Sequence, residues 1–273
     1  MTRALIFDSG VGGLSVVGEI RRHLPGLALD YAADDAFRPY GSKTPEQLRA
    51  RLPGLVRALA DASAAELVVI ACNTASVTAL DAIRASSRVP VVGVVPAVKP
   101  AALATRTGRI AVLGTPATVR QDYVSELVAD FASEHRVIRV GSVALVDMAE
   151  AKLAGESVDA ARLARELTML GAHPDLDTVV LACTHFPLLR EELRAALPRG
   201  VKLIDSGEAI ARRVRSLLPA IGSETRPDMR PDTRPDTAVL VGPDPSPARR
   251  AAFARFGFVR VVALEEPLKE TVK

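Results

Sequence analysis

The two cysteines are the side chains best suited to chemistry, and they occur in similar segments. Cys72 follows the apolar run 68–71 and Cys183 follows the apolar run 179–182, and each is followed by a polar pair. Runs of this kind are typical of strands covered on both faces in a parallel sheet. Each thiol would then lie at the carboxyl end of a strand, where open α/β sheets bind ligands. The similarity predicts a duplicated architecture with one thiol from each half.

A buried cysteine often serves only as a small apolar side chain. The residues near the two thiols favour a reactive role instead. His185 is two residues beyond Cys183, close enough to help ionise it, and Asp8 ends an expected strand that could meet Cys72. A free thiol needs such help to act as a base near neutral pH.

Three reactive functions fit such a pair. A disulfide is one, although a cytosolic redox pair more often has C-x-x-C spacing. A zinc site with His185 is another, but structural zinc takes four ligands and the histidines show no ligand spacing. In the third, one thiolate removes a proton from a carbon while the opposed thiol protonates the other face. That is a racemase or epimerase, which needs neither metal nor pyridoxal phosphate, and the sequence shows no convincing site for either.

Composition narrows the class of protein. Of 273 residues, 48% are hydrophobic and 25% are charged, so the chain can bury a sizeable core as one large or two small domains. The 35 Lys and Arg residues nearly balance the 32 Asp and Glu residues, which gives a net charge of +3. Because no long basic run accompanies the pI of 9.1, nucleic acid is not an expected partner.

Localisation is predicted from what the sequence lacks. The residues Met1–Arg3 are followed at once by an apolar strand pattern and a glycine-rich loop, which leaves no room for a signal peptide. No segment approaches the roughly 18 uncharged apolar residues of a membrane span. Two cysteines without a secretory signal indicate reduced thiols. We therefore expect a cytoplasmic protein that does not bind a membrane.

Strands and helices alternate along the whole chain, which predicts a parallel α/β protein with both sheet faces covered. The expected strands are 3–7, 27–32, 68–71, 91–95, 109–113, 136–140, 178–182, 201–204, 238–241 and 259–264. The expected helices are 14–23, 44–61, 74–86, 97–105, 116–131, 143–153, 158–170, 187–197, 208–217 and 247–256. Residues 204–207 echo residues 6–10, a second sign of internal repetition.

Three local patterns refine this assignment. The glycine-rich loop 8–13 can bring backbone N–H groups to an anion, although Asp8 fits equally well as a helix N-cap. Thr44, Pro45 and Gln47 form a capping-box pattern. The Arg-Pro-Asp repeat over 226–236 is expected to be a mobile surface linker.

Six segments together resemble the glutamate racemases of bacterial cell-wall synthesis, within the cofactor-independent aspartate/glutamate racemase superfamily. They occur in the family's order and cover roughly residues 4–210. The segments are Phe7-Asp8-Ser9-Gly10-Val11-Gly12-Gly13-Leu14, Pro39-Tyr40-Gly41, Ala71-Cys72-Asn73-Thr74-Ala75, Val91-Val92-Gly93-Val94, Cys183-Thr184-His185 and Ile204-Asp205-Ser206-Gly207.

The resemblance implies interconversion of L- and D-glutamate for peptidoglycan without a cofactor or metal. It implies two pseudo-symmetric α/β domains, 1–97 with 208–273 and 98–207, an active site in the cleft between them, and a homodimer. Cys72 and Cys183 would be the acid/base pair, assisted by Asp8 and His185. The substrate would be held by Asp8, Ser9, Tyr40, Gly41, Asn73, Thr74, Thr184 and His185.

The chain departs from the family pattern in two places. The usual Ala-Cys-Pro segment with a following Glu is replaced by residues 141–150, where Glu150 is the candidate for that Glu. The usual Gly-Asp-Thr-Ala-Arg before Pro-Tyr-Gly is replaced by residues 33–38. Two alternatives stay open: a racemase of aspartate or a related acid, and a non-catalytic binding protein that retains the fold.

Overall fold

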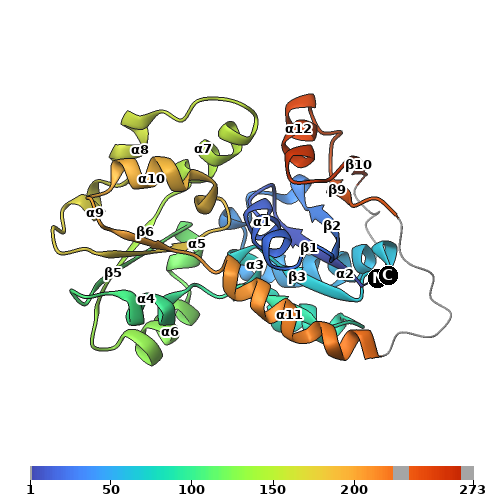
Figure 1. Ribbon diagram of the computed structural model, residues 1–273, viewed down its shortest axis with the longest axis horizontal. Helices are drawn as coiled ribbons and strands as arrows, with labels where there is room; N and C mark the ends of the chain where they lie inside the picture. Colours follow the sequence, from blue (N-terminus) through green and yellow to red (C-terminus); the bar gives the residue numbers. More distant parts are fainter. Residues whose placement is uncertain (1, 224–233, 266–273) are drawn as a thin grey trace.

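The computed structural model describes residues 2–223 and 234–265, in which two parallel sheets lie side by side (Figure 1). The larger sheet has the strand order β10-β9-β2-β1-β3-β4 and the smaller one β6-β5-β7-β8. Every strand pair is parallel, as predicted. The strands are β1 Arg3–Asp8, β2 Ala28–Ala33, β3 Leu67–Ile70, β4 Val91–Gly93, β5 Arg109–Gly114, β6 Arg136–Gly141, β7 Thr178–Ala182, β8 Lys202–Ile204, β9 Thr237–Val241 and β10 Arg260–Leu264.

Helices cover both faces of each sheet. On the larger sheet, α1 Leu14–His23, α11 Gly207–Ser223 and α12 Pro247–Arg255 pack on one face, and α2 Pro45–Ser63 and α3 Asn73–Ser86 on the other. On the smaller sheet, one face carries α7 Ala144–Leu153, α8 Ala160–Glu166, α9 Thr168–Gly171 and α10 Arg190–Ala196. Its other face carries α4 Val98–Ala104, α5 Pro116–Val119 and α6 Asp122–Ala132. Short 3₁₀ turns are η1 Asp35–Phe37, η2 Tyr40–Ser42 and η3 Phe186–Leu189.

Strand β1 shows why continuous apolar runs form these sheets. Successive side chains of a strand point to opposite faces. Ile6 packs into the core beneath α1, and its neighbour Phe7 packs into the core beneath α2 and α3. Because both faces are covered by helices, both side chains must be apolar.

The two sheets repeat one topology. The order β2-β1-β3-β4 of the larger sheet recurs as β6-β5-β7-β8 in the smaller one, so β3 and β7, the strands before the two cysteines, are equivalent. The predicted duplication is confirmed. The echo between residues 6–10 and 204–207 does not follow this repeat, because it joins β1 to β8, whereas the counterpart of β8 is β4.

Three expected helices are interrupted. The segment 116–131 forms α5 and α6, because Gln121 adopts an extended conformation and begins a new helix. The segment 158–170 forms α8 and α9, which meet at Leu167. The segment 187–197 begins as the turn η3 before α10. The capping box of Thr44 and Gln47 is present at the start of α2.

The Arg-Pro-Asp repeat is only partly described, since its units 226–228 and 230–232 lie outside the described residues. The third unit is anchored rather than a free linker. Asp236 accepts hydrogen bonds from the backbone N–H of Leu29 (3.0 Å) and from Arg21 Nη2 (2.8 Å). This unit therefore fastens the start of β9 beside β2.

The chain leaves the larger sheet after β4 and returns to it after β8 (Figure 1). The division into domains at residues 97/98 and 207/208 stays a prediction. None of the helices within residues 2–223 and 234–265 combines the length and hydropathy needed to cross a membrane.

Candidate active site

A cavity of about 450 Å³ lies between the two sheets, at the carboxyl ends of their central strands. Both thiols line it, Cys72 from the larger sheet and Cys183 from the smaller one. Its wall also contains Ser9, Tyr40, Gly41, Asn73, Thr74, Thr184 and His185. The structure thus brings together every residue predicted for the site except Asp8, whose side chain lies behind the wall.

Cys72 is held in an environment that favours the neutral thiol. It sits at the N-cap of α3 and is buried, with Sγ 3.7 Å from Ser9 Oγ. Burial raises its pKa to about 12, and the negative charges of Asp8 and Cys183 act in the same direction. Hydrogen bonds from Ser9 and the Ala75 backbone only partly oppose this. In the unliganded protein Cys72 is therefore a proton donor.

Cys183 has a different partner. Its Sγ lies 3.8 Å from His185 Nδ1, and His185 Nε2 lies 3.0 Å from Glu150 Oε1. Burial alone would lower the pKa of His185, but its hydrogen bonds to Cys183 and Glu150 outweigh burial and raise the pKa to about 10. The imidazolium can therefore stabilise a negative charge on the adjacent sulfur.

Glu150, the candidate for the family's glutamate, lines the cavity beside His185. Burial would raise its pKa, but the hydrogen bond and charge of His185 and the charges of Arg249 and Arg38 lower it to about 2. At neutral pH the Glu150 carboxylate is therefore ionised while His185 is protonated. The sequence pattern pointed to this residue, but it gave no indication of the two arginines.

Asp8 is fully buried and links the two halves from beneath the cavity. Thr184 Oγ1 donates to Asp8 Oδ2 (3.0 Å), and the backbone N–H of Gly10 donates to Asp8 Oδ1 (2.9 Å). The N-cap interpretation of Asp8 was wrong, because the N-cap of α1 is Gly13 and Asp8 closes a local turn instead. Burial raises the pKa of Asp8, against the opposing charge of His185.

The loop that carries Tyr40 and Gly41 is held by a buried carboxylate. The Asp34 carboxylate accepts a hydrogen bond from the Tyr40 hydroxyl (2.7 Å) and two hydrogen bonds from Arg51, each 2.7 Å. The Tyr40 hydroxyl is thus engaged within the protein. This arrangement fixes the Pro39–Ser42 loop against the cavity.

Sequence reasoning missed a threonine cluster on the opposite wall. Thr74 Oγ1 lies 3.1 Å from Thr118 Oγ1, which in turn lies 3.0 Å from Thr115 Oγ1. Thr115 is the N-cap of α5 and Thr118 lies within α5, so both belong to the segment that follows β5, the counterpart of the segment that follows β1. The available signal was that the expected strand 109–113, like the expected strand 3–7, is followed by a small polar segment and then a helix.

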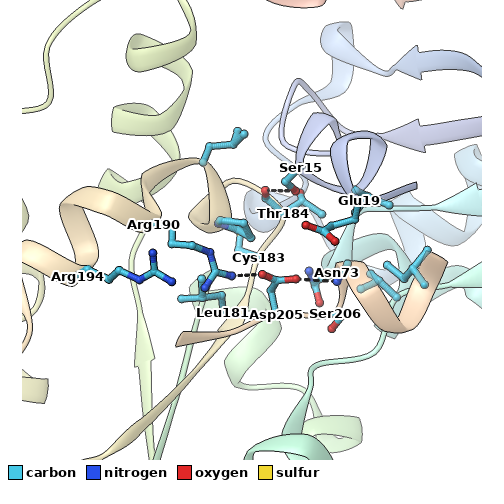
Figure 2. A pocket seen from close by; sticks show the side chains of 16 residues that line it. Ser15, Glu19, Asn73, Leu181, Cys183, Thr184, Arg190, Arg194, Asp205 and Ser206 are labelled. Carbon is cyan, nitrogen blue, oxygen red and sulfur yellow. Dashed lines mark hydrogen bonds and ion pairs between the residues drawn. The ribbon is translucent and has the colours of Figure 1, made fainter. Parts of the chain in front are cut away.

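A second cavity of about 270 Å³ lies behind Cys183 (Figure 2). Asn73, Cys183 and Thr184 line both cavities, so they form a shared wall. In the second cavity Arg190 is paired with Asp205, and Ser15 Oγ donates to the Thr184 carbonyl at 2.8 Å. Among the described residues, no three His, Cys, Asp or Glu side chains form a group that could hold a metal ion.

Gly12 provides a steric test of this geometry. A Cβ atom at Gly12 would lie 2.4 Å from His185 Nδ1 and 2.5 Å from Thr184 Oγ1. We expect Gly12→Ala to displace His185 and lower catalytic activity at least about tenfold, since small displacements of reacting groups are costly. Gly54→Ala is the matched control, because its Cβ would meet nothing within 4 Å. Equal activity of the two variants would contradict the placement of His185.

Comparisons with known proteins agree with this arrangement. The family model described as Asp/Glu/Hydantoin racemase matches residues 13–214. The chain is 54% identical over 216 residues to a glutamate racemase of Sphingopyxis alaskensis, an alignment that covers 78% of this chain and 81% of the relative.

Two solved structures have the same fold. The crystal structure of Escherichia coli glutamate racemase in complex with L-glutamate and the activator UDP-MurNAc-ala has a TM-score of 0.90 and 43% identity, and covers 97% of this chain and 98% of the other. A glutamate racemase isoform from Bacillus anthracis has a TM-score of 0.82 and 26% identity, and covers 98% and 99%.

Proposed function

Because this chain belongs to the Asp/Glu/hydantoin racemase family and, within it, to the glutamate racemases, we propose that it interconverts L- and D-glutamate by proton transfer between two thiols. The observation that carries the mechanism is the single cavity lined by Cys72 from one half and Cys183 from the other. The product would supply peptidoglycan synthesis in the cytoplasm.

The reaction is a proton removal and a proton addition at the same carbon. A thiolate takes the α-proton of glutamate, and the pair of electrons stays on Cα as carbanion character. The opposed thiol then donates its proton to the other face, which inverts the centre and leaves the second sulfur as the thiolate. Atoms and charge balance without a cofactor.

The two thiols have different surroundings. Cys72 is the protonated partner, since burial and the nearby charge of Asp8 disfavour its thiolate. Cys183 Sγ lies 3.8 Å from Nδ1 of His185, whose imidazolium can stabilise a negative charge on that sulfur when Cys183 acts as the base. Each sulfur serves as the base in one direction and as the acid in the other.

Small polar groups are proposed to hold the substrate. Asn73 Oδ1 is buried without a hydrogen-bond partner among the described residues, so it can accept from the α-ammonium group. Ser9, Thr74 and Thr184 offer hydroxyl groups to the carboxylates, and Asp8 acts through Thr184. Displacement of water from the cavity by the substrate would strengthen such interactions with developing charge.

The proposal predicts that the purified protein converts L-glutamate to D-glutamate without added metal or cofactor. Chiral chromatography measures the D-glutamate formed. Turnover of aspartate in place of glutamate would keep the mechanism and change the substrate. Failure with both amino acids would contradict the proposed activity and favour a binding protein. The homodimer stays a proposal, which sedimentation of the same sample tests.

A further inference from the structure

The carboxylate of Glu150 is held from two sides. Its Oε1 lies 3.0 Å from His185 Nε2, inside the substrate cavity. Its Oε2 faces two arginines, with Arg249 Nη2 at 3.4 Å and Arg38 Nη1 at 3.7 Å. Because each oxygen has its own partner, the plane of the carboxylate is fixed as well as its position.

The same two arginines also contact Asp35. Arg249 Nη1 lies 2.6 Å from Asp35 Oδ2, and Arg38 Nε lies 2.6 Å from Asp35 Oδ1. Asp35, Arg38, Glu150 and Arg249 therefore form a charge ring. Asp35 and Arg38 precede α2 beside the larger sheet, Arg249 is on α12, and Glu150 is on α7 over the smaller sheet, so the ring joins the two halves beside the active site.

The two arginines are not equivalent. The side chain of Arg249 is 17% exposed and that of Arg38 is 41% exposed, whereas the carboxylates of Asp35 and Glu150 are 7% and 18% exposed. Solvent screens an ion pair more strongly as it becomes more exposed. Arg249 also approaches Glu150 more closely. It is therefore the stronger holder of this carboxylate.

We propose that Arg249 is a positioning residue of the racemase: by binding Glu150 and Asp35 at once, it fixes the carboxylate that orients His185 against Cys183. This inference rests on the proposed function. Arg249 lies on α12, outside the segment 13–214 that matches the family model. The C-terminal β9-α12-β10 unit thus takes part in catalysis through one side chain, which does not itself line the cavity but contacts Glu150 and Asp35 in its wall.

Two neighbours on α12 provide matched controls. Arg250 bonds within its own unit, to Asp244 and to the Val261 carbonyl. Arg255 donates to the Leu153 carbonyl at the end of α7 (2.6 Å), so it helps to dock α12 without contacting Glu150. Arg250→Gln therefore reports on the stability of the unit, and Arg255→Gln reports on its docking.

The experiment measures kcat and KM in both directions for these controls, Arg249→Gln and Arg249→Lys, with thermal unfolding of each protein. We expect Arg249→Gln to lower kcat about 10- to 100-fold, the equivalent of one charge-assisted hydrogen bond, with a smaller change in KM. Arg249→Lys should recover most of this loss. Both controls should stay within about twofold of the unsubstituted enzyme, well below that hydrogen-bond equivalent.

A directional isotope effect separates positioning from general loosening. With α-deuterated glutamate, Arg249→Gln should show a larger primary isotope effect in the direction in which Cys183 removes the proton. In that direction the labelled hydrogen moves to the sulfur that His185 assists, whereas in the other direction it moves to Cys72. An equal change in both directions, or the same loss in Arg255→Gln, would overturn the proposal. If Arg249→Gln does not fold, Asp35→Asn, which releases the other end of Arg249, must show the same one-directional effect or the proposal fails.

Failure of this inference is distinguishable from failure of the proposed function. Racemisation by the unsubstituted chain together with normal kcat in Arg249→Gln would overturn the positioning role alone. No racemisation by the unsubstituted chain would overturn the proposed function and the inference with it.

Discussion

Replacing either Cys72 or Cys183 by alanine should lower glutamate racemisation at least about 10³-fold, the usual worth of an essential acid or base. Each thiol is the acid in one direction and the base in the other, so neither direction can proceed without both. The measurement is the initial rate of formation of each enantiomer. Both side chains are small and buried, so unfolding midpoints should confirm that the variants remain folded.

The single variants should differ from the double variant. A variant with one remaining thiol can still remove and return the α-proton of one enantiomer, and it should exchange that proton with solvent. The double variant should not exchange the α-proton of either enantiomer. Racemisation by a single variant at a rate near that of the unsubstituted chain would contradict the two-thiol mechanism.

Removing the charge of Glu150 should move the alkaline limb of the pH profile to lower pH. The pKa of His185 is near 10, above its usual 6.5, partly because Glu150 accepts its hydrogen bond and attracts its positive charge. In Glu150→Gln the pKa of His185 falls, so the imidazolium beside Cys183 is lost at a lower pH. We expect kcat/KM at neutral pH to fall about 10²-fold, within the range for acid–base partners.

The same shift affects stability with a definite sign. Because the pKa of His185 is higher in the folded state, its protonation stabilises the fold fully below about pH 6.5 and loses this effect as pH rises toward 10. Glu150→Gln should flatten this part of the stability profile.

Glu192→Gln is the matched control, since Glu192 pairs with Lys152, and neither residue lines the cavity. An unchanged alkaline limb in Glu150→Gln, or an equal shift in Glu192→Gln, would contradict the assigned role.

The elements that carry strong local patterns were predictable from sequence. The run 179–182 is apolar throughout, and a short apolar run bounded by polar residues is typical of a strand between two helical layers. The duplication and the positions of Cys72 and Cys183 followed from this pattern. Helix ends were less predictable. Near the break at Gln121, for example, Thr118 contacts Thr74, which is 44 positions away, and local spacing does not reveal such a contact.

The residues that sequence reasoning missed are joined by tertiary structure alone. Arg249 is 99 positions from Glu150, and Asp35 is 214 positions from Arg249, so no local spacing connects them. For Asp8, the local pattern gave a wrong interpretation. Its position at a strand end suggested a local cap, but its partner Thr184 is 176 positions away.

Racemisation of L-glutamate in D₂O, stopped after a few per cent of conversion, tests the two-thiol mechanism most directly. The deuterium content of the α-carbon is measured separately in the D-glutamate formed and in the L-glutamate recovered. Two opposed thiols predict deuterium in the product and protium in the recovered substrate, because one sulfur removes the substrate proton and the other supplies a solvent-derived one. Product that retains the substrate's own α-proton would show that a single base moves it between faces, and would contradict the account.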